Sequence, residues 1–194
     1  MTAEKASLNF NAVFLARNPP SDPRIVQMAQ WGKRFKQGGM VKEAEGNLSF
    51  RTRLGFIISG TGVSLDALAP ETVCEVKGVV YGLHRTSVYV KGAVVPSSET
   101  ILHAQIYDEC PEVNAVFHVH DARVMDQAER LGVPETAEEK QAGTQDLAQE
   151  AVRLVKSDKG MGYFILKGHG GVALGRTLDE AGCLVEEMRA RATG

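Results

Sequence analysis

The sequence predicts a single α/β domain, on three observations. Its 194 residues are enough for one domain with a substantial buried core. Segments with apolar residues at helical spacing recur between segments that show the alternation or the short apolar runs typical of strands. No repeat, low-complexity segment or linker divides the sequence. We therefore expect one domain over residues 1–194, with residues 1–20 as an irregular N-terminal arm.

The composition is that of an ordinary globular protein, with 43% hydrophobic and 24% charged residues and a net charge of −2. The absence of a basic block argues against nucleic acid as a partner. No apolar run approaches the roughly 18 residues of a membrane span, and the start lacks the apolar segment of a secretory signal. Three scattered cysteines without a Cys-x-x-Cys pair indicate a reducing compartment. We expect a cytoplasmic protein with no membrane contact.

The first half of the chain is predicted to form one helix and four strands. Asp22 is the expected N-cap and Pro23 the first residue of the helix, which ends at Gly38-Gly39. His84 is expected at the surface near a turn. Strands are predicted over residues 45–51, 55–59, 72–76 and 86–90, the first two as a hairpin.

The second half is predicted to contain four helices and three strands. The first helix starts at Pro96-Ser-Ser-Glu99, with Ser97 or Ser98 as its N-cap, and runs to about Cys110. Thr144 is expected to cap a later helix, and Thr177-Leu-Asp-Glu180 is a capping box. The other predicted segments are a helix over 121–131, a loop or short helix at the surface over 133–143, a helix from 144 to about 158, a C-terminal helix to 192, and strands over 115–120, 163–166 and 172–174.

Two histidines lie two residues apart inside the apolar run Ala115-Val-Phe-His-Val-His120. In a strand, His118 and His120 share one face, so together they can bind one metal ion. Neutral imidazole suits zinc and other borderline metals. Two ligands are too few for a tight site. His169 is a candidate third ligand, because it follows an apolar run and lies between glycines that let the backbone approach a ligand.

Other polar motifs are weak signals when taken alone. The helix that starts near Ser97 brings Glu99 and His103 to one face, four residues apart, and a short link joins this helix to the His-x-His strand. Ser59-Gly-Thr-Gly62 and the serine pair at the helix start can both bind an anion. The simpler interpretations are a turn between two elements and a capped helix start.

Five motifs occur in a specific order: Gly46-Asn47, Thr61-Gly62, Ser97-Ser98-Glu99, His118-x-His120 and Gly168-His169-Gly170. In this order and spacing they resemble the class II aldolase/adducin family, and within it the L-fuculose-phosphate aldolases, over residues 24 to 190. The resemblance implies a three-layer α/β/α domain with a central, mostly antiparallel sheet. It also implies a homo-oligomer, commonly a tetramer.

The resemblance also implies roles for individual residues. His118, His120 and His169 match the family's metal ligands, with Zn²⁺ expected and Mn²⁺ or Co²⁺ as alternatives. Glu99 matches the acidic residue that completes the resting metal shell and then acts as the base. The residues that match the family's pocket for the substrate phosphate are Gly46, Asn47, Thr61, Gly62, Ser97 and Ser98.

The implied function is cleavage of a small ketose phosphate, such as L-fuculose 1-phosphate, to dihydroxyacetone phosphate and an aldehyde. The metal stabilises an enediolate as a Lewis acid, and Glu99 moves the proton. The same site can serve a sugar-phosphate 4-epimerase, a dehydratase or a decarboxylase. Adducin-like domains, which lack the metal ligands and act in assembly without catalysis, are the non-enzymatic alternative.

The sequence departs from the family in its tyrosines. The aldolases use one tyrosine after the His-x-His motif, contributed by a neighbouring subunit, and another near the C-terminus, as proton donors. Residues 121–162 contain no tyrosine, and the chain has only four, at positions 81, 89, 107 and 163. Glu135, Glu138 and Glu139 lie in the region where the first donor is expected. The departure leaves the proton donor unassigned and the reaction type open.

Overall fold

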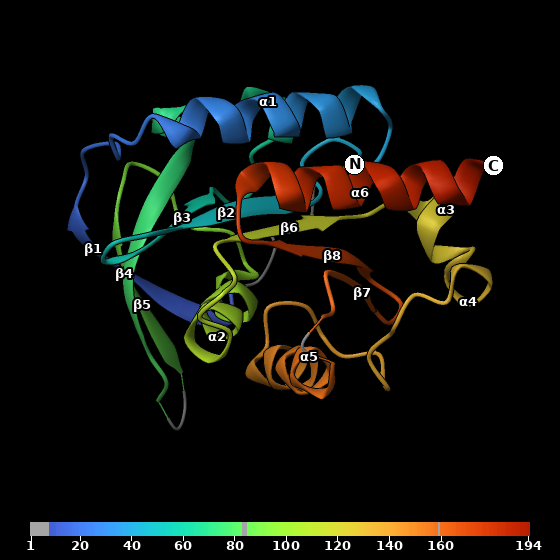
Figure 1. The fold of residues 1–194 in the computed structure, drawn as a ribbon. Helices are drawn as coiled ribbons and strands as arrows, with labels where there is room; N and C mark the ends of the chain where they lie inside the picture. Colours follow the sequence, from blue (N-terminus) through green and yellow to red (C-terminus); the bar gives the residue numbers. More distant parts are fainter. Residues whose placement is uncertain (1–7, 83–84, 159) are drawn as a thin grey trace, which may run out of the picture.

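The computed structural model describes residues 8–82, 85–158 and 160–194, and His84 lies outside the described residues (Figure 1). One eight-stranded sheet has the order β1-β5-β4-β3-β2-β6-β8-β7. The pairing of β1 with β5 is parallel and the other six pairings are antiparallel, so the sheet is mixed. The strands are β1 (Phe10–Ala16), β2 (Asn47–Thr52), β3 (Gly55–Ser59), β4 (Val73–Val80), β5 (Thr86–Lys91), β6 (Ala115–Val119), β7 (Tyr163–Leu166) and β8 (Gly170–Gly175).

Helices cover both faces of the sheet. Figure 1 shows α1 and α6 on one face and α2 and α5 on the other. The helices are α1 (Arg24–Gln37), α2 (Thr100–Glu109), α3 (Ala122–Met125), α4 (Ala128–Leu131), α5 (Gln145–Ser157) and α6 (Leu178–Thr193), with short 3-10 helices at Leu65–Ala67 and Pro70–Thr72. The expected α/β fold with a central sheet is confirmed. In the described part of the chain, no helix combines the length and apolar character needed to cross a bilayer.

The prediction of an irregular arm over residues 1–20 was wrong for residues 10–16, which form the edge strand β1. Phe10 is buried, but most of the following side chains are only partly covered, so the sequence carries no clear alternation. What holds this segment is its backbone pairing with β5, which begins at Phe10 opposite Thr86. Pairing of this kind between distant segments leaves little trace in a local pattern.

Helix ends and one helix interior also differ from expectation. Glu99, rather than Ser97 or Ser98, is the N-cap of α2, and Pro23 rather than Asp22 is that of α1. The segment predicted as one helix over 121–131 forms two short helices, α3 and α4, which meet at Asp126 and Gln127. In these two helices only Val124 of α3 is buried. Because a helix is stabilised mainly by packing against the core, this segment has little to stabilise one continuous helix. The expected Thr144 cap is present, and the Thr177 hydroxyl accepts from the Glu180 N–H.

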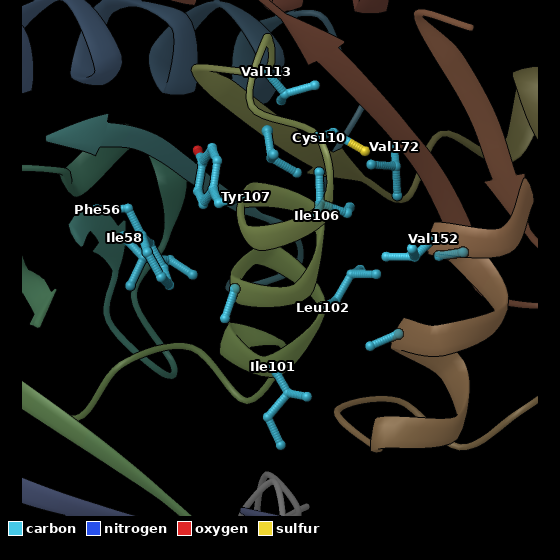
Figure 2. Close-up of a cluster of buried hydrophobic side chains, with 14 of the residues drawn as sticks. Phe56, Ile58, Ile101, Leu102, Ile106, Tyr107, Cys110, Val113, Val152 and Val172 are labelled. Atoms are coloured by element: carbon cyan, nitrogen blue, oxygen red, sulfur yellow. The ribbon is translucent and has the colours of Figure 1, made fainter. Parts of the chain in front are cut away.

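The two faces of β6 have different neighbours, and this decides where the histidines point. Ala115, Phe117 and Val119 belong to the core under α1 and α6. Val116 belongs to the other core, which α2 and α5 cover and which Figure 2 shows around α2. Because strand side chains alternate, His118 lies on the α2 side of the sheet.

Candidate metal centre and active site

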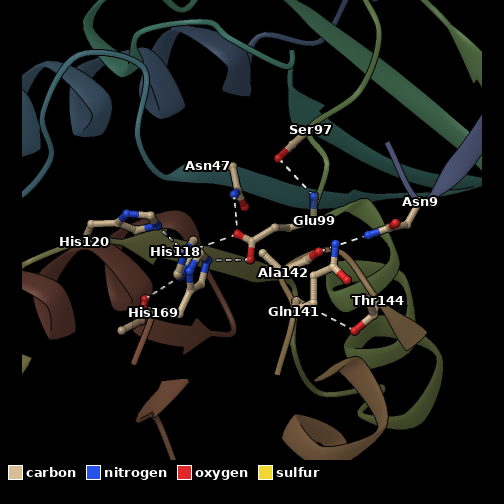
Figure 3. A network of polar contacts seen from close by, with 11 residues as sticks. Asn9, Asn47, Ser97, Glu99, His118, His120, Gln141, Ala142, Thr144 and His169 are labelled. Atoms are coloured by element: carbon tan, nitrogen blue, oxygen red, sulfur yellow. Dashed lines mark hydrogen bonds and ion pairs between the residues drawn. The ribbon is translucent and has the colours of Figure 1, made fainter. Parts of the chain in front are cut away.

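Three of the predicted site residues converge at one end of β6 and β8. His118 lies near the end of β6 and His120 directly follows the strand, while His169 directly precedes β8. Because β6 and β8 are antiparallel, with Val119 opposite Gly171, the end of one strand meets the start of the other. One ring nitrogen from each histidine lies within 4.8 Å of the other two (Figure 3).

The rings are held so that their nitrogens face one another. The Nε2 atoms of His118 and His120 are 2.8 Å apart. His118 Nδ1 lies 3.0 Å from the Gly171 carbonyl oxygen, which can only accept, so Nδ1 carries the hydrogen and in the neutral ring Nε2 keeps its lone pair. Burial lowers the pKa of both His118 and His120 to about 4. Neutral imidazoles with converging lone pairs are the form that binds a metal ion, so these residues fit a divalent metal.

A glycine is required beside the histidine pair. A Cβ at Gly170 would lie 2.8 Å from His118 Cε1 and 3.0 Å from His120 Cδ2. It would also lie 2.6 Å from the Val119 carbonyl oxygen, which is backbone and cannot easily move aside. The Gly-His-Gly motif therefore supports the histidines by leaving room for their rings.

Glu99 lies beside the cluster, at the N-cap of α2, and only 3% of its surface is exposed. His169 Nε2 lies 2.9 Å from Glu99 Oε1. Glu99 Oε2 accepts a hydrogen bond from Asn47 Nδ2 at 2.8 Å and is 3.2 Å from His118 Nε2. Burial by itself raises the pKa of Glu99, but its interactions with these three residues outweigh burial and lower it. The carboxyl group is therefore held as an anion.

The carboxylate of Glu99 also raises the pKa of His169. Burial lowers the pKa of His169, but the hydrogen bond and the charge of Glu99 more than compensate, and the net pKa is raised. His169 therefore differs from His118 and His120, whose pKa values burial lowers. Its Nε2 atom lies toward Glu99, where the carboxylate favours a hydrogen on that nitrogen when no metal is bound.

His103 takes part in a second buried network under the site. Its Nδ1 lies 2.6 Å from Ser49 Oγ, which is also 2.7 Å from the hydroxyl of Tyr107. Burial lowers the pKa of His103 to about 4, so the ring is neutral. This network joins α2 to β2 and gives His103 a structural place that its sequence position did not explain.

The predicted site residues, except His118, line one cavity of about 930 Å³. His118 is fully buried and is absent from the cavity wall. Asn47 Oδ1 is buried and has no partner among the described residues. The lining residues of the cavity are Leu8, Ala44, Glu45, Gly46, Asn47, Gly60, Thr61, Gly62, Arg85, Val95, Ser97, Ser98, Glu99, His120, Ala142 and His169.

The structure adds residues to this cavity that sequence reasoning missed. Leu8, Arg85 and Ala142 come from distant segments, and Ala142 is tied to the N-terminal segment by a hydrogen bond from Asn9 Nδ2 to its carbonyl oxygen at 3.1 Å (Figure 3). In the sequence, Arg85 is only a charged residue near a predicted turn. Nothing in the sequence links it to the five motifs or predicts that it lines the cavity.

The tyrosines of the described residues lie outside the cavity wall. Tyr107 is buried against Ser49, and the Tyr163 hydroxyl lies where a side chain on Gly171 would be. Of the three glutamates near the expected donor position, Glu139 lies against Gly168, next to His169. Glu138 instead pairs with Lys140, and Glu135 bridges to Ile165.

Comparison with known families identifies the class of protein. The family described as Class II Aldolase and Adducin N-terminal domain matches residues 26–193. The chain therefore belongs to the class II aldolase and adducin family, as its motifs predicted. Its similarity to enzymes of this family assigns it to the metal-dependent lyases.

Particular relatives differ in the reaction that their names give. The chain is 33% identical over 152 residues to an L-fuculose phosphate aldolase of Methanococcus vannielii, covering 70% of this chain and 75% of that protein. It is 26% identical over 182 residues to a methylthioribulose-1-phosphate dehydratase of Pseudoalteromonas translucida, covering 80% and 82%. The structure of an L-fuculose-1-phosphate aldolase from Thermus thermophilus matches with a TM-score of 0.72 at 22% identity, over 89% of this chain and 92% of that one, and shows the shared fold.

Proposed function

We propose that the chain is a zinc-dependent aldolase that cleaves a small ketose phosphate, similar to L-fuculose 1-phosphate, into dihydroxyacetone phosphate and an aldehyde. The observation that carries the proposal is the single cavity in which two of the clustered histidines, Glu99 and three loops of small or hydroxylated residues meet. The names of the aldolase relatives support the same substrate class.

In this proposal, His118, His120 and His169 hold the metal through neutral ring nitrogens. Three imidazoles without a thiolate favour zinc, and Mn²⁺ or Co²⁺ are alternatives. When bound, the ion would supply a Lewis acid that polarises the oxygens of the ketose and stabilises negative charge next to them.

Glu99 is the proposed proton carrier. Its lowered pKa keeps the carboxylate ready to accept a proton at Oε1 or Oε2. Asn47 helps to fix its orientation through the hydrogen bond that its Nδ2 donates to Oε2, so the carboxylate needs less reorganisation during the reaction. Glu99 is nearly completely buried, which limits the contact of its carboxylate with water.

The loops around Thr61 and Ser97 are the proposed site of the substrate phosphate. Part of their hydrogen-bonding capacity is already used, since the Thr61 N–H and hydroxyl donate to the carbonyl oxygens of Val95 and Pro96. The Gly62 N–H and the Ser98 hydroxyl have no partner among the described residues and are free to donate to a ligand. Holding the phosphate would fix the reacting carbon relative to the metal and Glu99.

A dehydratase acting on a methylthioribulose 1-phosphate is the second candidate. The dehydratase relative covers more of this chain than the aldolase of Methanococcus vannielii does. The described cavity wall also contains no tyrosine, the residue that the aldolases of this family use to protonate the departing aldehyde oxygen. Epimerisation at C4 and decarboxylation are further reactions that the same group of residues can support.

The decisive experiment is an assay of product with purified, zinc-loaded protein. We expect L-fuculose 1-phosphate or a related ketose 1-phosphate to yield dihydroxyacetone phosphate, detected by a coupled reductase. Glu99→Gln is expected to retain zinc and lose at least about 100-fold in kcat, the scale of general acid–base catalysis. Loss of water from methylthioribulose 1-phosphate, without any dihydroxyacetone phosphate from the ketose phosphates, would replace the aldolase by the dehydratase.

Assembly and location are parts of the same proposal. We propose a homotetramer, on the resemblance to the family, and a cytoplasmic location. The location is supported by Cys74, Cys110 and Cys183, which are all free thiols in the structure. Sedimentation velocity would test the stoichiometry, and a sharp monomer peak at micromolar concentration would contradict it.

A further inference from the structure

We propose that Arg85 supplies the positive charge that binds the phosphate of the substrate, and so selects phosphorylated over free sugars. The inference rests on the proposed function, because it concerns the ligand of the same cavity. Arg85 directly precedes β5, lies outside the five motifs, and lines the cavity together with Thr61, Gly62 and Ser98.

The first argument is the charge of the cavity. The six residues that resemble the family's phosphate pocket are all neutral, and Arg85 is the one lysine or arginine among the described lining residues. Glu45 and Glu99 add negative charge to the same wall. Without Arg85 and a bound metal, the charged side chains of the wall would repel a doubly charged phosphate. The positive charge of Arg85 therefore contributes to phosphate binding in addition to the hydrogen bonds that its guanidinium donates.

The second argument is that the Arg85 charge is not used elsewhere. The ion pairs among the described residues do not include Arg85. Its Nη2 donates to two backbone carbonyl oxygens, of Leu8 and Phe10, each at 3.3 Å. These contacts orient the guanidinium without neutralising it. Nε and Nη1 have no partner in the described part of the chain and can donate to a ligand.

The third argument is chemical fit. Arginine presents a planar fork of N–H donors that matches the oxygens of a phosphate and is charged at any relevant pH. The neutral loops offer separate single donors, such as the Gly62 N–H and the Ser98 hydroxyl, that fix position more than they supply charge. The loops would therefore orient the phosphate, and Arg85 would provide most of the electrostatic affinity for it.

Titration calorimetry on the zinc-loaded full-length protein tests this, with inorganic phosphate and dihydroxyacetone phosphate as the probes. We expect Arg85→Gln to weaken the affinity for each probe by about 10- to 100-fold, the range of a charge-assisted hydrogen bond. Arg85→Lys should weaken these affinities less. Arg53→Gln is the matched control, since Arg53 is exposed and lines a different hollow, so its affinities should stay within about twofold.

A second measurement needs no variant. Inorganic phosphate should slow the modification of Arg85 by phenylglyoxal in the wild-type protein, read by peptide mass, and leave Arg53 unaffected. Unchanged phosphate affinity in Arg85→Gln, or no phosphate binding by the zinc-loaded wild-type protein, would overturn the proposal. Phosphate binding that depends on Arg85 in a protein that never releases dihydroxyacetone phosphate would keep Arg85 and reject the aldolase.

Discussion

Asn47 lies directly opposite His118 in the antiparallel pairing of β2 with β6, and both side chains contact the same oxygen of Glu99. The pairing fixes this arrangement, because a shift of one residue would turn Asn47 to the other face of the sheet. The register of this one strand pair therefore positions both His118, a proposed metal ligand, and Asn47, the donor that orients Glu99. The sheet forms the framework of the site, and Glu99 comes from the N-cap of α2 on the same face of the sheet.

The first prediction concerns the bond from Asn47 to Glu99. Asn47→Ala removes the Nδ2 donor and leaves Glu99 Oε2 with less compensation for burial, which should lower the free energy of unfolding by about 1–3 kcal/mol. Urea denaturation of the metal-free protein at fixed concentration measures it. Asn11→Ala is the control, since Asn11 is exposed on β1 and its change should stay within about 0.5 kcal/mol. Equal losses in the two variants would mean that the buried contact does not stabilise the fold.

The second prediction concerns the metal. Wild-type protein should carry about one zinc per chain, and His118→Ala should abolish it, because two remaining histidines are too few for a tight site. Elemental analysis after exhaustive dialysis gives the stoichiometry. His103→Gln is the control, since His103 is a buried histidine of the same region that is not part of the convergent group, and its variant should retain zinc. Full zinc occupancy in His118→Ala would contradict the assignment of the ligands.

Much of the fold could be predicted from local patterns. The apolar spacing of α1, the alternation in β2 and the Thr144 cap of α5 were all evident in the sequence, because each depends on near neighbours along the chain. Strand β1 was not evident, since its side chains are mostly half-buried and its pairing partner, β5, lies about 75 residues away. Residues 10–16 form a strand because they pair with β5, which is distant in sequence.

The candidate site divides in the same way. His118, His120 and His169 were identifiable because histidine is rare in this chain, which contains five, and Glu99 because its spacing from them matches a family pattern. The structure places these four side chains beside one another. Arg85 and Ala142 were not identifiable, because an arginine near a turn and an alanine in a polar loop are common. Their relation to the cavity is created only when β1, β5 and the loop before α5 pack side by side.

The third prediction tests the space that Gly170 leaves for the histidines. A methyl group at this position would meet the Val119 carbonyl oxygen and both the His118 and His120 rings, so Gly170→Ala should displace the rings. We expect zinc affinity to fall by at least about tenfold, measured by competition with a chromophoric chelator, since correct ligand geometry is essential for binding. Gly78→Ala is the control, because a Cβ there has no neighbour within 4 Å. Wild-type affinity in Gly170→Ala would show that the rings tolerate the added methyl group.

The fourth prediction concerns thiol reactivity and its dependence on pH. Burial raises the pKa of Cys74 to about 12, so its thiol stays protonated and unreactive at pH 8, and Cys110 is also buried with a raised pKa. Cys183 is exposed. Ellman's reagent at pH 8 should therefore modify one thiol per folded chain quickly and all three only after denaturation. Cys183→Ser should remove the fast phase, and a fast phase that persists in that variant would contradict the burial of the other two.

The last prediction concerns the contact between α6 and α1. A Cβ at Gly182 would overlap the Trp31 ring, whose Nε1 also donates to Asp179 Oδ1 at 2.9 Å, so the ring is held from two sides. Alanine normally stabilises a helix by about 1 kcal/mol relative to glycine, but overpacking costs about 1–3 kcal/mol, so Gly182→Ala should lower the free energy of unfolding by up to about 2 kcal/mol.

Trp31→Leu provides the matched background for this test. Removing the ring should relieve the overlap, so that adding Gly182→Ala to Trp31→Leu becomes neutral or stabilising, as the helix propensity of alanine predicts. A double-mutant cycle from urea denaturation gives the coupling between the two positions, which should exceed about 1 kcal/mol because they are in direct contact. If Gly182→Ala costs the same with and without the Trp31 ring, the glycine is required for a reason other than the packing of α6 on α1.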